Sequence, residues 1–276
     1  MNNPADQDTH ESRLTRALDF TGKVVIVTGG TKGIGRVITT TFLEAGANVV
    51  ICARNAPEQP VSYEGREAVF VPCDVRDPEQ IKTVVDTTVD RFGRIDVLVN
   101  NAGGAPPAAS ATVSPRFNER IVALNLLAPM NFSQAVHDTM QAQDTGGVII
   151  NISSVSGIRP NPMGAAYGAA KAGLVNLSET LASEWGPKIR VLTVTVGLIV
   201  TEEAHLFYGD EEGIRRVGNT IPARRMGNPD DIADVVVFLA SPLARWMTGT
   251  NVMVHGGGEI PSYLSASTGE VTKVGS

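Results

Sequence analysis

A tyrosine and a lysine four positions apart carry the side chains that acid–base chemistry needs. Three small residues separate Tyr167 from Lys171. On a helix this spacing places both side chains on one face, with Cβ atoms roughly 5–6 Å apart. A free phenol titrates near pH ~10, and a neighbouring ammonium in a partly dry site lowers that pKa toward neutrality. The spacing also arises by chance, as a ring packed on a lysine stem, so the pair alone does not establish a site.

Two serines precede this pair and offer a second hydroxyl. Ser153 and Ser154 end an apolar run that begins at Val148. A hydroxyl at the end of a strand, close to the phenol, would hold a substrate oxygen against it. The residues alone leave both serines as candidates.

Short β-branched runs alternate with longer helical patterns along the chain, and these elements must position the hydroxyls. Unbroken apolar runs suit strands covered on both faces. The pattern predicts an α/β fold: one doubly wound, Rossmann-type domain with a mostly parallel seven-stranded sheet and helices on both faces. Strands are expected over 24–28, 48–53, 68–72, 95–100, 148–153, 189–196 and 251–254. Helices are expected over 34–45, 78–92, 115–141, 165–185, 202–217 and 229–240.

The domain is expected to span residues 21–260 and to bind both dinucleotide and substrate. Residues 1–20 and 261–276 are polar and without a period, so they are expected to be tails. Because no linker rich in serine or glycine divides the chain, a second domain is not expected.

A glycine-rich turn follows the first expected strand and leads directly into a helix. Its sequence is Thr28-Gly29-Gly30-Thr31-Lys32-Gly33-Ile34-Gly35. The glycines permit a tight turn, and the helix N-terminus offers free N–H groups and a partial positive charge to a pyrophosphate. The turn therefore predicts a dinucleotide site, with a ligand-free glycine turn as the alternative.

The charges near this turn favour NADP(H) over NAD(H). An NAD site places a carboxylate after the second strand, where it binds the ribose 2′-hydroxyl. This chain has Ala53 and Arg54 there, and Lys32 lies in the turn. Two cations without a carboxylate favour a 2′-phosphate. If Arg54 and Lys32 are ordinary surface charges, NAD(H) is the alternative.

The composition limits the classes of partner. The 276 residues include 23 Lys and Arg against 29 Asp and Glu, a net charge of −6, which argues against nucleic acid. Cys52 and Cys73 fall in apolar runs and are interpreted as reduced core residues, and the four histidines have no metal-binding spacing. The apolar runs are shorter than the ~18 residues of a membrane span, and residues 1–16 do not resemble a signal peptide. We therefore expect a cytoplasmic protein without metal, nucleic-acid or membrane partners.

Taken together, the motifs resemble the classical short-chain dehydrogenase/reductase family over about residues 21–258. The family's spacing of thirteen residues before the tyrosine selects Ser154 over Ser153. The matching motifs are the turn from Thr28 to Gly35, Asp74-Val75 after the third strand, Asn100-Asn101-Ala102-Gly103 after the fourth, Asn125 within a helix, Ser154, and Tyr167 with Lys171.

The resemblance implies an oxidoreductase that interconverts a ketone and a secondary alcohol. Tyr167 would exchange a proton with the substrate oxygen while hydride moves to or from the nicotinamide, and Ser154 would stabilise that oxygen. Lys171 would lower the pKa of Tyr167 and bind the nicotinamide ribose. Asn125 would hold a water of a proton relay, or distort its helix, or both. A dinucleotide-binding sensor without turnover is the alternative, against which the complete set of four argues.

The resemblance also implies a set of cofactor-binding residues. The set is Gly29, Thr31, Lys32, Gly33, Ile34, Gly35, Arg54, Asp74, Val75, Asn101, Ala102, Gly103, Tyr167, Lys171, Ile199 and Thr201. Val196-Gly197 stands where the family usually has Pro-Gly, which puts the backbone path near the nicotinamide in doubt. Enoyl reductases of the divergent branch place their lysine seven residues after the tyrosine, where this chain has Leu174. Carbonyl chemistry is therefore favoured.

Substrate specificity is expected from the loops 104–114, 157–166 and 201–225, since an open α/β sheet binds ligands at the carboxyl ends of its strands. An apolar segment in the third loop predicts a lid or, equally, a helix face packed on the sheet; it comprises Leu206, Phe207 and Tyr208. Three arginines would bind a carboxylate or a coenzyme A phosphate, or lie in solvent; they are Arg159, Arg215 and Arg216. We expect an apolar or alicyclic substrate, such as a steroid-derived compound or an acyl-CoA. Relatives of this type are commonly homotetramers or homodimers, which pair the helices that carry Asn125 and Tyr167.

Overall fold

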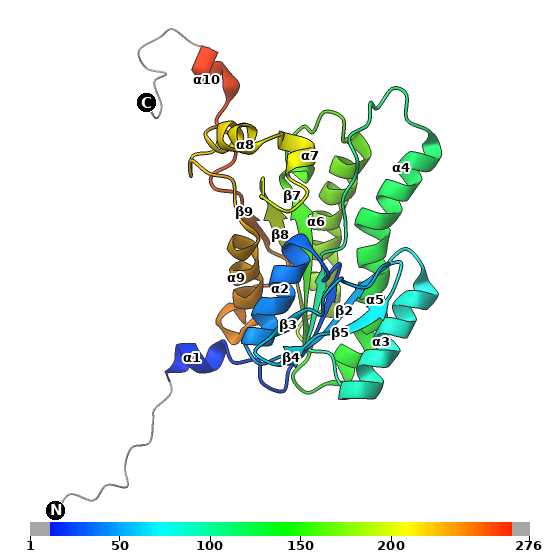
Figure 1. The fold of residues 1–276 in the computed structure, drawn as a ribbon. Helices are drawn as coiled ribbons and strands as arrows, with labels where there is room; N and C mark the ends of the chain where they lie inside the picture. The colour runs from blue at the N-terminus through cyan, green and yellow to red at the C-terminus, as the bar shows by residue number, and fades with distance from the viewer. Residues whose placement is uncertain (1–11, 267–276) are drawn as a thin grey trace, which may run out of the picture.

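Seven parallel strands form the centre of the structure, a computed structural model in which residues 12–266 are described (Figure 1). The strand order is β5-β2-β1-β6-β7-β8-β9, and every neighbouring pair is parallel. The strands are β1 (Val24–Thr28), β2 (Asn48–Ala53), β5 (Val69–Pro72), β6 (Val97–Asn100), β7 (Gly147–Ser154), β8 (Ile189–Val196) and β9 (Asn251–Val254). The doubly wound α/β fold is confirmed, with seven strands as expected.

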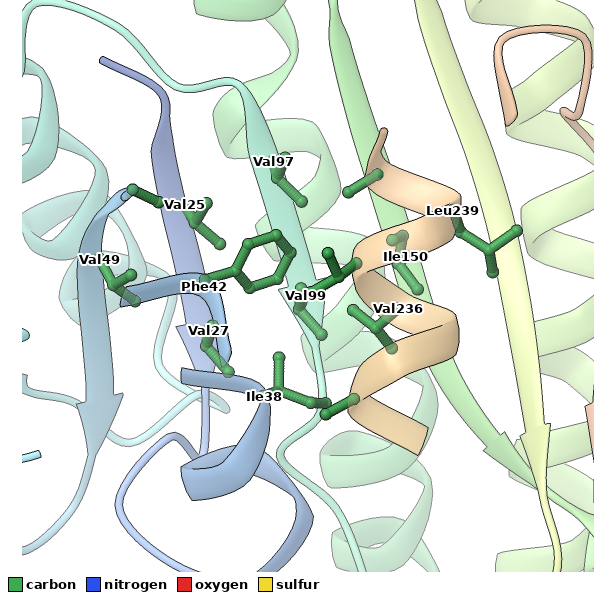
Figure 2. Packing of buried hydrophobic residues seen from close by; sticks show 14 of the residues in the cluster. Val25, Val27, Ile38, Phe42, Val49, Val97, Val99, Ile150, Val236 and Leu239 are labelled. Carbon is green, nitrogen blue, oxygen red and sulfur yellow. The ribbon is translucent and has the colours of Figure 1, made fainter. Parts of the chain in front are cut away.

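Helices cover both faces of the sheet, which explains why the strands are largely apolar. On one face α2 (Gly33–Glu44) and α9 (Pro229–Ala240) bury a cluster that includes Val27, Phe42 and Val236 (Figure 2). On the other face α3 (Pro78–Phe92), α5 (Ala128–Ala142) and α6 (Ala165–Trp185) bury a second cluster around Phe132. The central strands β1, β6, β7 and β8 are thus shielded from water on both sides, whereas the edge strand β9 leaves Met253 55% exposed.

A buried chain of hydrogen bonds attaches α5 and α6 to the middle of the sheet. The side-chain amide of Asn100 on β6 donates to Asn151 Oδ1 on β7 at 2.8 Å and to Ser133 Oγ on α5 at 3.2 Å. Asn151 in turn donates to Ser178 Oγ on α6 at 2.9 Å. Because a satisfied polar network in a core fixes the relative placement of its members, it holds α6 in register with β7.

The strand order reverses between β1 and β6, since the chain runs outward through β2 and β5 and then returns to β6. In open α/β sheets ligands bind at the carboxyl ends of the strands, near this reversal. In Figure 1 two short helices, α7 (His205–Tyr208) and α8 (Glu211–Gly218), lie beyond this edge. The edge is therefore the place where the predicted site residues converge.

Two expected helices are interrupted. The helix expected over 115–141 consists of α4 (Pro115–Val122), the π-helical η1 (Ala123–Leu127) and α5. The helix expected over 202–217 is wrong as a continuous element, because Gly209 adopts φ 78° between α7 and α8. Asp210 then begins α8 by accepting the Gly213 N–H at 2.9 Å, a favourable N-cap that starts a new helix.

Several short elements lack a sequence signal strong enough to predict them. They are α1 (Arg13–Ala17), the hairpin of β3 (Ser62–Tyr63) and β4 (Arg66–Glu67), the 3-10 turns η2 (Val155–Gly157) and η3 (Pro242–Ala244), and α10 (Ser262–Ala266). Both α1 and α10 fall in the segments expected to be tails, and the rest of those segments, 1–11 and 267–276, lies outside the described residues. Within residues 12–266, no helix is both long enough and apolar enough to cross a membrane.

Candidate active site

The structure brings Ser154, Tyr167 and Lys171 together where β7 ends beside α6. Ser154 is the last residue of β7, and Tyr167 lies in the first turn of α6. The Ser154 hydroxyl hydrogen-bonds the Tyr167 phenol. Burial raises the pKa of Tyr167 above its usual range, the Ser154 hydrogen bond opposes this rise, and the phenol of Tyr208 adds to it. Tyr167 is therefore protonated at neutral pH, as an acid must be.

Lys171 is almost wholly buried one turn further along α6, with 4% of its surface exposed. Its Nζ donates to the Ile152 carbonyl of β7 at 2.7 Å and lies 5.8 Å from the centre of the Tyr167 ring. Burial lowers the pKa of Lys171 to about 8. The Lys171 ammonium bonds to the backbone of β7, and burial is the largest influence on the Tyr167 phenol. The expectation that Lys171 lowers the pKa of Tyr167 stays a prediction.

The two candidate serines have different partners. The Ser153 hydroxyl is buried and donates to the Lys171 carbonyl at 3.0 Å. The Ser154 hydroxyl reaches Tyr167 and also accepts the Ser156 N–H at 3.2 Å. Side chains alternate across a strand, so Ser153 anchors α6 while Ser154 faces the phenol. This agrees with the choice of Ser154.

Asn125 lies in the π-helical segment η1 and is fully buried. Its side-chain amide donates to the Ile121 carbonyl at 2.9 Å and to the Gly104 carbonyl at 3.0 Å, and its Oδ1 accepts the Gly104 N–H at 2.9 Å. A side chain that inserts into the helix ladder favours a π-bulge. The expectation that Asn125 distorts its helix is confirmed, and its place in a water relay stays a prediction.

The side chains of Asn125 and Lys171 both approach Gly103, in the loop after β6. A Cβ on Gly103 would lie 2.8 Å from Asn125 Oδ1 and 3.2 Å from Lys171 Nζ. No larger residue fits between the amide and the ammonium without displacing one of them. The buried polar groups of α6, η1 and this loop thus form one cluster.

The glycine-rich turn fits a dinucleotide pyrophosphate. A Cβ on Gly35 would lie 2.2 Å from the Gly29 carbonyl oxygen, and a Cβ on Gly30 would lie 2.5 Å from an Ile51 methyl. The chain can therefore fold so tightly only with glycine. The N-cap residue of α2 is Lys32, and its side chain makes no cap hydrogen bond. The first backbone N–H groups of this twelve-residue helix are therefore not capped by Lys32 and can bind an anion.

Replacing Gly35 with alanine is expected to weaken dinucleotide binding at least tenfold, because the Gly29 carbonyl must move away from the new methyl group. Fluorescence titration with NADPH measures the loss, and thermal melting shows whether the fold survives. Gly173→Ala in α6 is the control, since its Cβ would meet a Leu126 methyl at 3.2 Å, and that side chain can move. An unchanged NADPH affinity in a folded Gly35→Ala protein would place the pyrophosphate elsewhere.

The predicted cofactor-binding residues follow different strands but share one edge of the sheet. Gly29 to Gly35 follow β1, Arg54 follows β2, Asp74 and Val75 follow β5, Asn101 to Gly103 follow β6, and Ile199 and Thr201 follow β8. Parallel strands end at the same edge, so the structure brings these segments together. Asn101 itself holds the turn, since its side-chain amide donates to the Thr28 carbonyl at 2.9 Å.

Two cations and one carboxylate stand at the ends of β2 and β5, and a third cation, Lys32, lies in the turn after β1. Arg54 is exposed, and Arg76 binds both carboxylate oxygens of Asp74, with Nε to Oδ1 at 2.9 Å. These hydrogen bonds lower the pKa of Asp74 to about 2, and the charge of Arg54 contributes to the shift. Lys32, the third cation, forms an ion pair with Glu203. Arg76 was missed by sequence reasoning, although its place two residues after Asp74 is visible in the sequence.

The segment after β8 lies over the glycine turn. A Cβ on Gly33 would lie 3.7 Å from the Thr201 side chain and 3.8 Å from Glu202. Val196, where the family usually has proline, is buried as the last residue of β8 and pairs with both Ser154 and Val254. Gly197 continues this pairing by donating its N–H to the Val254 carbonyl at 2.9 Å. Val196 and Gly197 therefore continue the parallel pairing of β8 with β9.

A cavity of about 400 Å³ opens beside Tyr167. Its lining carries no charged side chain, and most of its residues are apolar or small. They are Ala105, Pro106, Ala108, Ser110, Val113, Phe117, Asn118, Ile121, Met163, Gly164, Ala165, Ala166 and Tyr167. Two of the three segments expected to set specificity contribute to this lining.

The third segment presents an apolar surface to solvent. Leu206 is 68% exposed and Phe207 57% exposed, so the interpretation of these two as a face packed on the sheet is wrong. Arg215 and Arg216 both form ion pairs with Glu212 on the surface of α8, as expected for solvated arginines. Arg159, in contrast, forms an ion pair with Glu259. No group of His, Cys, Asp and Glu that could hold a metal ion occurs in the described part of the chain.

Comparison with known proteins gives the family. A family model described as Enoyl-(Acyl carrier protein) reductase matches residues 29–259. An uncharacterized oxidoreductase of Methylorubrum extorquens is 40% identical over 245 residues, which are 86% of this chain and 97% of that protein. A 7alpha-hydroxysteroid dehydrogenase of Escherichia coli is 34% identical over 247 residues, 87% of this chain and 96% of that one. The ligand-free structure of Thermoplasma acidophilum aldohexose dehydrogenase matches with a TM-score of 0.79 and 32% identity, over 87% of this chain and 94% of that chain.

The chain belongs to the short-chain dehydrogenase/reductase family. It is therefore an oxidoreductase that acts on CH–OH or related groups and uses NAD or NADP. Besides Arg76, two charged residues of this short-chain dehydrogenase/reductase site escaped sequence reasoning, Glu203 and Glu259. Neither has a local signal, because each meets its cation across a long stretch of chain.

Proposed function

We propose that this short-chain dehydrogenase/reductase is an NADP(H)-dependent oxidoreductase that interconverts a ketone and a secondary alcohol. The observation that carries the proposal is the contact of Tyr167 with Ser154 beside an uncharged cavity. A phenol whose pKa is raised by burial suits the reduction direction, because the proton must be present before it is given away.

Tyr167 donates its proton to the substrate oxygen in reduction and accepts it in oxidation. Ser154 donates a hydrogen bond to the same oxygen and stabilises the alkoxide charge that develops there. The substrate's carbonyl carbon, which accepts the hydride in reduction, must therefore lie next to Tyr167, at the mouth of the cavity. NADP(H), when bound, supplies or accepts the hydride.

Lys171 supplies the positive charge behind Tyr167 and is the first group from which the phenol regains its proton. Its pKa of about 8 allows it to exchange protons near neutral pH. Asn125 Oδ1 and Lys171 Nζ both approach the space beside Gly103, and a water in that space would link Lys171 to solvent. Lys171 would also bind the nicotinamide ribose in this arrangement.

The cofactor would lie along the carboxyl edge of the sheet. Gly29 to Gly35 and the N-terminus of α2 would hold the pyrophosphate, and Ile199 and Thr201 would contact the nicotinamide end. Asp74, Val75 and the segment from Asn101 to Gly103 would hold the adenosine. Arg54 and Lys32 favour the 2′-phosphate, and Arg76 adds a third cation close to Asp74.

Replacing Arg54 with aspartate is expected to weaken NADPH binding at least tenfold, because the 2′-phosphate loses a cation and meets a carboxylate. NADH binding should change by less than threefold. Fluorescence titration of both dinucleotides measures the effect, and Arg245→Asp, an exposed arginine beside η3, is the control. Equal or tighter binding of NADH by the unaltered protein would overturn the preference for NADP(H).

The substrate is proposed to be apolar or alicyclic. The cavity of about 400 Å³ has no charged lining, which suits a ring system better than a phosphate or a free acid. Leu206 and Phe207 would cover such a ring when α7 closes over the site. The hydroxysteroid dehydrogenase among the relatives acts, by its name, on an alicyclic alcohol.

Carbonyl chemistry is preferred to enoyl reduction for this chain. The matching family model has an enoyl reductase description, but the lysine here stands four residues after the tyrosine, and position 174 is a fully buried leucine. Leu174 packs in the core and has no group that could replace the lysine of the divergent branch. The relatives whose names specify a substrate include dehydrogenases of a hydroxysteroid and of an aldohexose.

The active form is proposed to be a homotetramer or homodimer that pairs α4, η1 and α5 with α6 of a second copy. Leu127 of η1 is 46% exposed in the isolated chain, and such a pairing would bury it. The expected cytoplasmic location stays a prediction.

A screen of ketones with NADPH, and of secondary alcohols with NADP⁺, followed at the nicotinamide absorbance band, tests the function. The panel includes cyclohexanones, oxosteroids and 3-oxoacyl-CoA compounds. Dinucleotide binding without turnover of any member would support the non-catalytic alternative.

A further inference from the structure

An ion pair joins two segments that lie one hundred positions apart at the substrate side of the site. Arg159 donates from Nε to Glu259 Oε2 at 2.9 Å and from Nη2 to Glu259 Oε1. Its Nη1 donates to the Pro160 carbonyl at 3.1 Å. The side chains are 36% and 28% exposed. This bidentate pairing with Glu259 occupies the Nε–Nη2 edge of the guanidinium, which would otherwise bind a substrate carboxylate.

Arg159 is fixed to the same turn as Ser154. Its backbone N–H donates to the Val155 carbonyl at 3.1 Å, and Val155 directly follows Ser154. Gly157 lies between Val155 and Arg159 and packs closely against α6. A Cβ on Gly157 would lie 2.8 Å from both the Ala172 nitrogen and the Lys171 carbonyl carbon. The guanidinium is thus held by a rigid connection to the reacting groups.

Glu259 reaches the site from the segment after β9. The Gly258 N–H donates to the His255 carbonyl at 3.1 Å, and the Ile260 N–H donates to the Thr220 carbonyl at 2.7 Å. These bonds on either side of Glu259 fix its backbone. Both partners are therefore held in place by their own segments.

Tyr208 of α7 connects the pair to the catalytic tyrosine. Burial raises the pKa of Tyr208, while Arg159 lowers it and Glu259 raises it, so both charges lie near this phenol. The charge of Tyr208 in turn raises the pKa of Tyr167, so these two phenols also lie near each other. The loop that carries Arg159 also supplies Met163 and Gly164 to the lining of the uncharged cavity beside Tyr167. The Arg159–Glu259 pair therefore stands on the same loop as one side of that cavity.

We propose that Glu259, by occupying Arg159, makes this enzyme select ketones whose far end is neutral and able to hydrogen-bond, and reject ketones with a carboxylate at that end. A hydroxyl or ester oxygen can accept from Arg159 without disturbing the pair, and a hydroxyl can also donate to Glu259. A substrate carboxylate would have to displace Glu259 or lie beside it, and like charges so placed repel each other.

This inference rests on the proposed ketone reduction, and a matched pair of substrates tests it. The probes are 4-oxocyclohexanecarboxylate and its methyl ester, assayed with NADPH at pH 7, and the readout is the ratio of the two kcat/KM values. The unaltered enzyme is expected to favour the ester at least tenfold. Glu259→Gln, which frees Arg159, is expected to shift the ratio at least tenfold toward the acid.

Two further variants make the result specific. Arg159→Gln combined with Glu259→Gln should bring the ratio to within about threefold of unity, because neither charge remains. Glu212→Gln removes the carboxylate that binds Arg215 and Arg216 on the surface and should leave the ratio unchanged. Melting temperatures identify any variant that fails to fold.

The outcomes separate the inference from the function on which it rests. If the ester is reduced but Glu259→Gln leaves the ratio unchanged, or if the unaltered enzyme prefers the acid, the role of Glu259 is wrong and ketone reduction stands. If neither probe nor any ketone of the wider panel is reduced while NADPH binds, ketone reduction itself is wrong, and the inference falls with it.

Discussion

Phenylalanine in place of Tyr167 is expected to lower kcat for ketone reduction by roughly 100- to 10,000-fold, the usual contribution of a positioned acid or base. The change deletes the proton donor and leaves the ring. Removal of the hydroxyl also frees Ser154, which keeps its hydrogen bond from the Ser156 N–H. The fold should therefore survive, with a change of less than about 1 kcal/mol in unfolding free energy.

Steady-state rates on a confirmed ketone, together with NADPH titration, measure the effect of Tyr167→Phe. The dinucleotide affinity should change far less than kcat, because the lost group acts on the substrate oxygen. Tyr263→Phe is the control, since that tyrosine is 68% exposed on α10. Turnover near that of the unaltered enzyme would show that another group delivers the proton.

The sequence predicted the strands well because most of their residues are apolar or β-branched. Strands β1, β2 and β8 have the bounds expected from the sequence, since burial on both faces leaves a continuous β-branched run that ends where the chain turns. The split of the helix expected over 202–217 was harder to predict. Glycine within a helical pattern is often tolerated, and here a positive φ at Gly209 and the Asp210 cap together end one helix and begin another.

Site residues that lie close together in the sequence could be predicted from it, whereas contacts between residues far apart in the sequence could not. Tyr167 and Lys171 share one helix, and the glycine turn is a single segment, so their spacing carries the information. The Arg159–Glu259 pair joins segments one hundred positions apart, and no local pattern relates them. The direction of the Tyr167 pKa shift was also hidden, because it depends on how deeply packing buries the phenol and on where Lys171 points.

Methionine in place of Lys171 is expected to abolish most activity and at the same time to stabilise the fold. Loss of the ammonium removes the proton source behind Tyr167, so kcat should fall at least 100-fold. The fold currently carries the cost of a buried charge: a pKa of about 8 instead of 10.5 corresponds to roughly 3 kcal/mol. Loss of the bond to the Ile152 carbonyl returns about 1–2 kcal/mol of this. Chemical denaturation at pH 7 should show a net gain of about 1–2 kcal/mol.

The pH dependence of this gain distinguishes a buried cation from a simple packing effect. Below pH 8 both folded and unfolded Lys171 are protonated, and the folded protein bears the full cost. Between pH 8 and 10.5 the folded lysine loses its proton while the unfolded one keeps it, so the unaltered protein gains stability and the advantage of methionine shrinks. Lys82→Met, an exposed lysine paired with Asp86, should show neither the gain nor this pH dependence. A stability difference that stays constant from pH 7 to 10.5 would mean that the folded protein keeps Lys171 protonated over the whole range, so that burial does not lower its pKa. Its role as a group that exchanges protons near neutral pH would fail with that result.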